Sequence, residues 1–170
     1  MIITTSRKPS QKTRTFVNDL GRVLGLKILN RGKTPLNEID SQYDKYILVG
    51  EYTGNPGKIE LHNNKNNTII SLLISAKLQK EVCGEETINT TNKIDIDFDK
   101  LFNEELGEYN YKELFLEFFK ELNDISIFKM NFEGSDGMNL FYIQFYKEDK
   151  RIGPLIIIKS IKIFDKNNNK

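Results

Sequence analysis

A run of hydroxyl-bearing and basic residues near the amino end is the first stretch whose composition suggests chemistry. It extends from Thr4 to Ser10 and reads TTSRKPS, between a short apolar strand predicted at Ile2 and Ile3 and a predicted helix. A helix N-terminus offers unpaired backbone N–H groups and a partial positive charge, which both favour a phosphate. Arg7 can bind phosphate through two parallel hydrogen bonds, and Lys8 adds a point charge. The alternative is a helix cap on a solvated basic loop.

A second basic loop occurs at Arg31-Gly32-Lys33-Thr34, again after a predicted strand and before a predicted helix. If the two strands are parallel and joined by the first helix, both loops leave the carboxyl edge of the sheet, where α/β sheets commonly bind ligands. Gly32 would let the backbone approach a phosphate closely. The nucleotide P-loop pattern is missing. The alternative is two independent surface loops.

Charge is distributed unevenly along the chain. Residues 2–33 hold eight basic residues and one acidic residue, although the whole chain has a net charge of only +1. The basic residues are Arg7, Lys8, Lys12, Arg14, Arg22, Lys27, Arg31 and Lys33. Such a cationic segment predicts contact with nucleic acid phosphates. Residues 81–124 hold thirteen acidic and four basic residues, so an RNA-binding face should exclude them.

Three further features could carry chemistry. Asp95, Asp97 and Asp99 alternate with apolar residues, so they form either the solvated face of a strand or, as an alternative, the metal site of a nuclease. His62 is the only histidine, and we interpret it as a surface or loop residue at a strand end. Cys83 is the only cysteine, which excludes an internal disulfide and a cysteine-based zinc site.

Composition is that of a globular protein, with 38% hydrophobic and 29% charged residues. No apolar run is long enough for a signal peptide or a membrane span. The single cysteine fits a reducing compartment. We therefore expect a cytoplasmic protein with no membrane partner.

Periodicity predicts the elements that must position the basic loops. A helix is expected from Ser10 to Gly25, with one apolar face formed by Phe16, Val17, Leu20, Val23 and Leu24. A strand at Ile28 and Leu29, a helix capped by Thr34 with Pro35 at its first position, and a buried strand at 46–49 should follow. We predict a turn at 54–57, strands near 59–61 and 68–78, and a connection at 79–93.

The second part of the chain repeats this mixture of elements. We predict a strand at 94–98, a long helix from about Asn110 with Phe115, Phe118 and Phe119 packed in the core, and strands at 129–132, 140–146 and 155–164. The pattern indicates an α/β or α+β protein with a mixed sheet.

Several of these segments resemble the Brix domain family. The resemblance begins with Ile2 to Ser10, Arg14-Thr15-Phe16 and Asn30 to Lys33, and continues in order with Val49-Gly50-Glu51, Gly54 to Gly57 and Arg151 to Pro154. It extends over nearly the whole chain, and the length is similar to that of the short stand-alone archaeal members. The N-terminal block is the most specific part.

The resemblance implies a ribosome biogenesis factor that binds ribosomal RNA during rRNA processing and subunit assembly, without enzymatic activity, catalytic residues, cofactor or metal. It implies an α/β fold of two similar halves of mixed sheet with packed helices, each resembling the anticodon-binding domain of class IIa aminoacyl-tRNA synthetases. The domain would span residues 1–164, with halves at about 1–80 and 94–164 and a polar tail at 165–170.

The residues expected to bind RNA come from the basic N-terminal block. They are Thr5, Ser6, Arg7, Lys8, Ser10, Lys12, Arg14, Arg22, Arg31 and Lys33. Other assembly factors or ribosomal proteins are further expected partners. The chain departs from the eukaryotic family pattern at Leu155, where a basic residue is usual, and at Asn66-Asn67-Thr68, where Gly-Pro-Thr is usual. An alternative is a protein-interaction module whose acidic middle docks basic ribosomal proteins.

Overall fold

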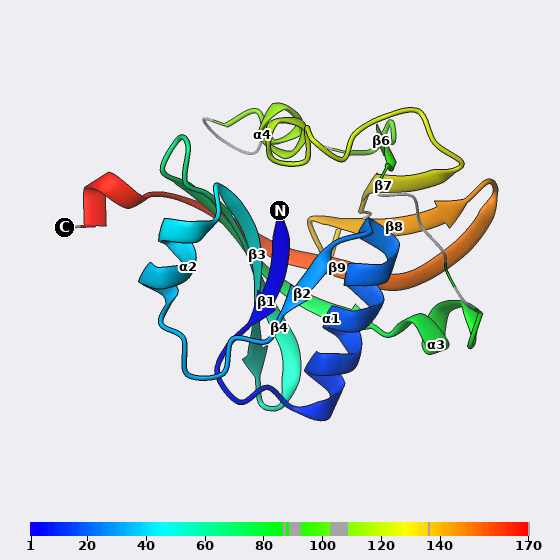
Figure 1. Cartoon of the computed structure of the whole chain (residues 1–170). Coiled ribbons are helices and arrows are strands. Elements are labelled where there is room, and N and C mark those ends of the chain that lie inside the picture. Colours follow the sequence, from blue (N-terminus) through cyan, green and yellow to red (C-terminus); the bar gives the residue numbers. More distant parts are fainter. Residues whose placement is uncertain (87, 89–92, 103–108, 136, 170) are drawn as a thin grey trace.

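The computed structural model describes residues 1–86, 88, 93–102, 109–135 and 137–169 (Figure 1). The first part contains β1 (Ile2–Thr5), α1 (Gln11–Leu24), β2 (Lys27–Leu29), α2 (Leu36–Gln42), β3 (Lys45–Tyr52), β4 (Asn55–Asn63), β5 (Thr68–Lys77) and α3 (Gln79–Cys83). The second part contains β6 (Asp95–Phe98), α4 (Tyr111–Phe118), β7 (Phe128–Gly134), β8 (Phe141–Lys147), β9 (Lys150–Asp165) and the 3₁₀ helix η1 (Lys166–Asn169). The predicted mixed α/β architecture is confirmed.

All strands join one nine-stranded sheet in the order β2-β1-β3-β4-β5-β9-β8-β7-β6. Strand β1 is parallel to both β2 and β3, and β6 is parallel to β7. All the other neighbouring strands are antiparallel. The long strands β5 and β9 pair at the centre of the sheet, so they join the first and second parts of the chain into one layer.

The side chains of strand β3 enter two separate cores, one on each face of the sheet. Successive β3 side chains point to opposite faces. Ile47 and Val49 belong to the large core together with the apolar face of α1, whereas Tyr46 and Leu48 belong to a smaller core with Ile39 of α2. Helices α1 and α2 therefore lie on opposite faces of the strands that carry the basic loops (Figure 1).

Helix α1 has the boundaries that its sequence predicts. The Ser10 side chain caps its N-terminus by accepting a hydrogen bond from the Thr13 backbone N–H at 3.2 Å. Gly25 ends the helix in the left-handed conformation, with φ of 63°. The Ser10 hydroxyl also donates to the Gly54 carbonyl at 2.8 Å, which ties the start of the helix to the β3–β4 hairpin.

Three local predictions differ from the structure. The turn lies at Thr53 and Gly54, which both have positive φ, and residues 55–57 already belong to β4. Pro35 rather than Thr34 is the N-cap of α2. The helix that starts after Asn110 ends at Phe118, although its phenylalanines are buried as expected.

The ends of several other segments also differ. Strand β9 begins at Lys150, five residues before the strand predicted at 155–164. The predicted connection at 79–93 begins with the short helix α3, and its residues 87 and 89–92 lie outside the described part. In the polar tail, η1 follows β9 directly, and Lys170 is not described.

His62 is buried within β4, so its prediction as a surface or loop residue is wrong. Its ring stacks on that of Tyr46, with centroids 4.3 Å apart, and its Nε2 contacts a Glu60 carboxylate oxygen at 3.0 Å. Lys58 contacts the other Glu60 oxygen at 2.7 Å. Sequence spacing gave no sign of this burial because the stacking partner comes from the neighbouring strand.

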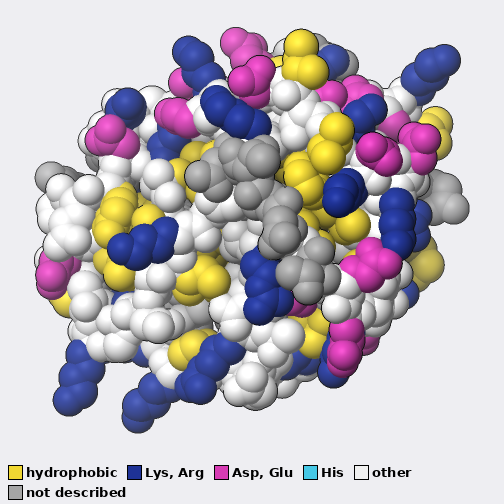
Figure 2. All heavy atoms as spheres, turned by 45° about the vertical axis from the view of Figure 1, so that its right-hand side comes forward, with side chains coloured by type: hydrophobic (Ala, Val, Ile, Leu, Met, Phe, Trp, Pro, Cys, Tyr) yellow, Lys and Arg dark blue, Asp and Glu magenta, His cyan; other side chains and the backbone are white. Residues whose placement is uncertain are grey.

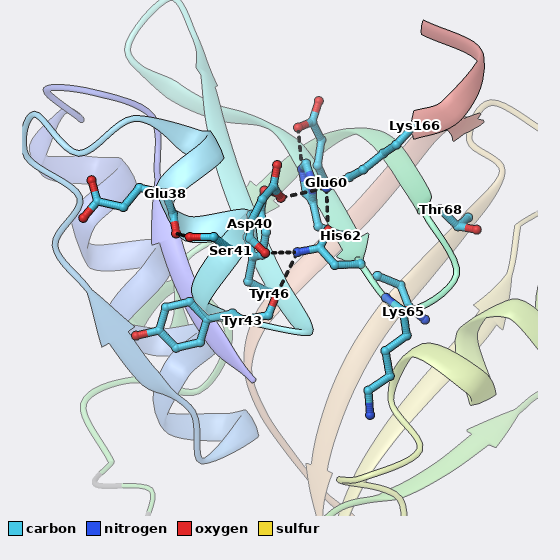
Figure 3. A network of polar contacts seen from close by, with 12 residues as sticks. Glu38, Asp40, Ser41, Tyr43, Tyr46, Glu60, His62, Lys65, Thr68 and Lys166 are labelled. Atoms are coloured by element: carbon cyan, nitrogen blue, oxygen red, sulfur yellow. Dashed lines mark hydrogen bonds and ion pairs between the residues drawn. The ribbon is translucent and has the colours of Figure 1, made fainter. Parts of the chain in front are cut away.

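A polar network around Tyr46 anchors α2 and the carboxyl end of the chain (Figure 3). The Tyr46 hydroxyl donates to Asp40 of α2 at 2.8 Å, and Lys166 of η1 donates to the same carboxylate oxygen at 2.7 Å. Asn64 donates to the backbone carbonyls of Asp40 and Tyr43. Because α2 directly follows the second basic loop, this network also fixes where that loop ends.

Replacing Ser10 with alanine is expected to lower the free energy of unfolding by about 1 kcal/mol, because the first turn of α1 loses its cap. Urea unfolding followed by circular dichroism measures the change. Ser41→Ala is the matched control, since the Ser41 hydroxyl donates to the Glu38 carbonyl in α2 and caps no helix start. Equal unfolding midpoints for the two variants would contradict the capping role.

Stability should depend on the charge of Glu60. Hydrogen bonding from His62 and then Lys58 outweighs burial and lowers the pKa of Glu60 to about 2, from an ordinary value of 4.5. A lowered pKa in the folded state stabilises the protein above the unfolded-state pKa, and this contribution disappears as pH falls towards the folded-state value. Glu60→Gln should therefore cost about 3 kcal/mol near neutral pH and about half as much near pH 3.

Urea unfolding of the wild type and of Glu60→Gln at both pH values measures this difference. Glu117→Gln, at an exposed position on α4, is the control and should show no such pH dependence. A Glu60→Gln deficit that stayed constant between the two pH values would show that the carboxylate charge is not the cause.

Candidate nucleic-acid interface

The two basic loops leave the same edge of the sheet. Strands β1 and β2 are parallel neighbours, with Ile3 paired to Ile28, and α1 connects them. Both chain segments therefore run out of the sheet in the same direction. The strands are thus parallel, which was the condition for the two loops to meet, and residues 6–9 lie next to residues 30–34.

A groove of about 920 Å³ lies between these loops and α1. We call it the basic groove, and its lining consists of Thr5, Arg7, Lys8, Pro9, Arg14, Val17, Asn18, Ile28, Asn30, Arg31, Gly32 and Lys33. Five of these residues are cationic, and no aspartate or glutamate is among them. Three separate segments of the chain therefore contribute positive charge to one concave surface.

Backbone geometry shapes the second loop. Gly32 has a φ of 55°, and the Thr34 N–H donates to the Arg31 carbonyl at 2.9 Å, which closes a tight turn. The Arg31 Nε donates in return to the Thr34 carbonyl at 2.8 Å. This bond holds the half-buried guanidinium group of Arg31 in place before any ligand binds.

The cations of the basic groove form no ion pairs among the residues that the structure describes. Arg7, Lys8, Arg14 and Lys33 are exposed. None of these four, nor Arg31, forms an ion pair with a residue that the structure describes. Figure 2 shows Lys and Arg side chains projecting at the lower edge of the molecule, whereas many Asp and Glu side chains lie in the upper half of that face. The positive potential of the five groove cations is therefore available to an anion.

The N-terminus of α1 differs from the sequence-based expectation. The Ser10 backbone N–H donates to the carboxylate of Glu51 from β3. The side chains of Ser10 and Thr13, and to a smaller extent this backbone bond, lower the pKa of Glu51. An anionic side chain of the protein already lies where a phosphate was expected. Binding of an anion must therefore depend on the long cationic side chains and not on the helix N-terminus.

Not every residue predicted to bind RNA lines the basic groove. Thr5, Arg7, Lys8, Arg14, Arg31 and Lys33 do. Ser6 extends the sheet by donating its N–H to the Val49 carbonyl at 3.0 Å, and Ser10 is the helix cap. Lys12 is exposed on α1 outside the groove lining.

Arg22 also lies outside the groove. Its Nη1 atom is 3.9 Å from a carboxylate oxygen of Asp19. Arg22 lines a different pocket, together with Gln79 and Lys80 of α3. A row of every fourth residue drifts by about 40° per step around a helix, so Arg22 is about 80° away from Arg14. Asn18, four residues after Arg14, stays in the groove, and periodicity could have identified it.

Asp95 and Asp97 of β6, and Asp99 just after it, belong to no cluster of metal-binding side chains among the described residues. In this described part of the chain, no three His, Cys, Asp or Glu side chains are arranged to hold a metal ion. One Asp99 carboxylate oxygen accepts backbone hydrogen bonds from Leu101 and Gly134, each at 2.9 Å, so it closes a loop.

Within the described residues, no helix is long and apolar enough to cross a membrane.

Comparison with known proteins identifies relatives of this chain. No family model matches the chain. It is 46% identical over 167 residues to the probable Brix domain-containing ribosomal biogenesis protein of Methanococcus maripaludis, and the alignment covers 97% of this chain and 99% of that protein. A protein of the same name from Methanosarcina mazei is 37% identical over 84 residues, which is 48% of this chain and 54% of that relative.

Solved structures show the same fold. The archaeal Imp4-like protein Mil matches with a TM-score of 0.72 at 21% identity, covering 96% of this chain and 99% of that one. A probable ribosomal biogenesis protein from Aeropyrum pernix matches with a TM-score of 0.73 at 20% identity, covering 94% of both chains. By its near full-length relationship to the Methanococcus protein, the chain belongs to the family of Brix domain-containing ribosomal biogenesis proteins.

Proposed function

We propose that this chain binds ribosomal RNA through the basic groove during rRNA processing and ribosomal subunit assembly. The observation that carries the proposal is that Arg7, Lys8, Arg14, Arg31 and Lys33, from three segments, line one groove without an ion-pair partner among the described residues. Clustered unpaired cations repel one another and lower stability. Their clustering is explained if a polyanion neutralises them.

RNA suits this surface for a physical reason. Each phosphate that a lysine or arginine neutralises releases condensed counterions, and this release drives binding. Arg31 is preorganised by its bond to Thr34, so less side-chain entropy is lost when it contacts a phosphate. Contacts of this kind recognise the RNA backbone and carry little sequence information.

The protein would act as a non-enzymatic assembly factor in the cytoplasm, with ribosomal RNA as its main partner. The names of its relatives describe ribosomal biogenesis proteins, which supports this role. Ribosomal proteins and other assembly factors are further proposed partners.

The alternative of a docking module for basic proteins has less support. Several acidic residues of the middle segment are paired within the chain. Glu121 contacts Lys45 at 3.1 Å, Asp124 contacts Lys93 at 3.8 Å and Glu86 contacts Lys150. Glu104, Glu105 and Glu108 lie outside the described residues. Retention of a protein partner after RNase treatment would favour this alternative.

Strand pairing supports the proposal that the domain consists of two similar halves. Strands β1, β3, β4 and β5 are consecutive neighbours in the sheet, the first pair parallel and the others antiparallel. Strands β6, β7, β8 and β9 repeat this pattern, and β5 pairs with β9 where the two sets meet. We further propose that each half resembles the anticodon-binding domain of class IIa aminoacyl-tRNA synthetases.

Exchanging both Arg7 and Arg31 for glutamate should weaken binding to ribosomal RNA fragments by about a hundredfold or more at low salt, because two attractive contacts become repulsive. With five groove cations, wild-type affinity should fall with log[salt] at a slope of about −3 to −5, and the variant slope should be smaller by about 2. Fluorescence anisotropy over a salt series measures both quantities.

Lys162→Glu is the matched control, because Lys162 is exposed on β9 and does not line the basic groove. It should change affinity by much less than either groove substitution alone. If Arg7→Glu and Arg31→Glu bound RNA as tightly as Lys162→Glu, the basic groove would be rejected as the RNA-binding face.

A further inference from the structure

The basic groove contains more than cations. Pro9 and Ile28 are half-buried, so these apolar side chains lie deeper than the exposed Arg7, Lys8, Arg14 and Lys33. Two exposed amides, Asn18 and Asn30, complete the wall. A surface that bound only phosphates would not need apolar residues and two amides in its lining, so the lining suits a ligand with an apolar body and polar edges.

We infer that the basic groove takes an unpaired nucleotide of the RNA, with its base inside the groove and its phosphates on the surrounding cations. This inference rests on the proposed function and specifies the part of the RNA that is recognised. The volume of about 920 Å³ lies within the range of pockets that enclose small molecules, so it accommodates a base with its sugar.

The chemistry of each groove region matches one part of a nucleotide. Pro9 and Ile28 offer apolar surface to the face of a base, and the guanidinium plane of Arg31, held by Thr34, offers a stacking surface. Amide groups both donate and accept hydrogen bonds, as the edge of a base requires. Arg7, Lys8, Arg14 and Lys33 then lie where flanking phosphates would pass.

A double helix would not use these apolar side chains. In an A-form duplex the bases are stacked inside and the phosphates lie outside, so a duplex could contact the cations of the rim but could not place a base against Ile28. The groove should therefore distinguish unpaired RNA from duplex RNA. A purely electrostatic face would prefer the form with the higher phosphate density.

The test compares three RNA probes by fluorescence anisotropy with the intact chain. They are a short single-stranded RNA, the same strand annealed to its complement, and the same strand with its central bases replaced by abasic sites. The abasic strand keeps every phosphate, so only base contacts are lost. We expect it to bind about tenfold or more weakly than the intact strand, and the duplex to bind more weakly as well.

A double substitution separates base contacts from charge. Asn18→Ala with Asn30→Ala should weaken binding of the intact strand by about fivefold or more and leave binding of the abasic strand unchanged. The salt slope should stay the same because no charge is removed. Asn37→Ala, at an exposed position on α2 outside the groove, is the matched control and should have no effect.

The possible outcomes distinguish this inference from the proposed function. If the three probes bind equally and only Arg7→Glu and Arg31→Glu weaken binding, the groove contacts phosphates alone and the inference is overturned while RNA binding stands. If binding of all probes is independent of Arg7 and Arg31, both are overturned. Weaker abasic binding that is insensitive to the asparagine substitutions would place the base elsewhere and would also overturn the inference.

Discussion

The close packing of α1 on β2 is the contact that the basic groove depends on. Gly21 lies on the buried face of α1, and a Cβ atom there would be 3.0 Å from the Ile28 Cγ1 atom and 3.3 Å from the Leu26 carbonyl oxygen. The missing side chain lets the helix lie directly against the strand that follows it. This approach keeps α1, β1 and β2 in one tight unit, so the loops after both strands end up side by side. The helix-weakening effect of a mid-helix glycine is the cost of this packing.

That unit brings the positive charges of the basic groove together, and solvent exposure, burial of α1 and helix capping offset their repulsion. The long cationic side chains reach solvent, where water and salt reduce their mutual repulsion. The apolar face of α1 is buried against β1, β3 and β4, and the Ser10 and Gly25 caps fix both ends of the helix. Glu51 also supplies a carboxylate beside the start of α1, close enough to Arg14 that this arginine contributes to its lowered pKa. Burial and capping therefore stabilise the unit, while its charges stay available to a ligand.

The opposite face of the sheet is organised by polar contacts more than by a large apolar core. Tyr46 is fully buried there and joins three elements, since its ring stacks on His62 and its hydroxyl donates to Asp40 (Figure 3). Burial and the neighbouring Asp40 raise the pKa of Tyr46, so its hydroxyl keeps the proton that it donates. Lys166, from the other end of the chain, neutralises the same carboxylate. In this way Lys166, the first residue of η1, contributes to the position of α2 and of the loop before it.

Local sequence signals determined the elements that carry the groove. The spacing of Phe16, Leu20 and Val23, with Ser10 and Gly25 at the ends, was enough to define α1, because capping and amphipathic periodicity are properties of neighbouring residues. The unequal charge distribution and the order strand, basic loop, helix also indicated which loops could meet. The mixed sheet could be predicted for the same reason, since alternation and turn residues are local.

Only the tertiary structure decided which side chains share a surface. The sequence grouped Arg22 and Lys12 with Arg14, but helical drift sends Arg22 towards Asp19 and α3, and Lys12 lies outside the groove. The sequence also suggested an open helix N-terminus, whereas Glu51 reaches it from a strand more than forty residues later. His62 is buried because Tyr46 comes from the adjacent strand. These outcomes depend on contacts between residues far apart in the chain, and periodicity and propensity carry no information about such contacts.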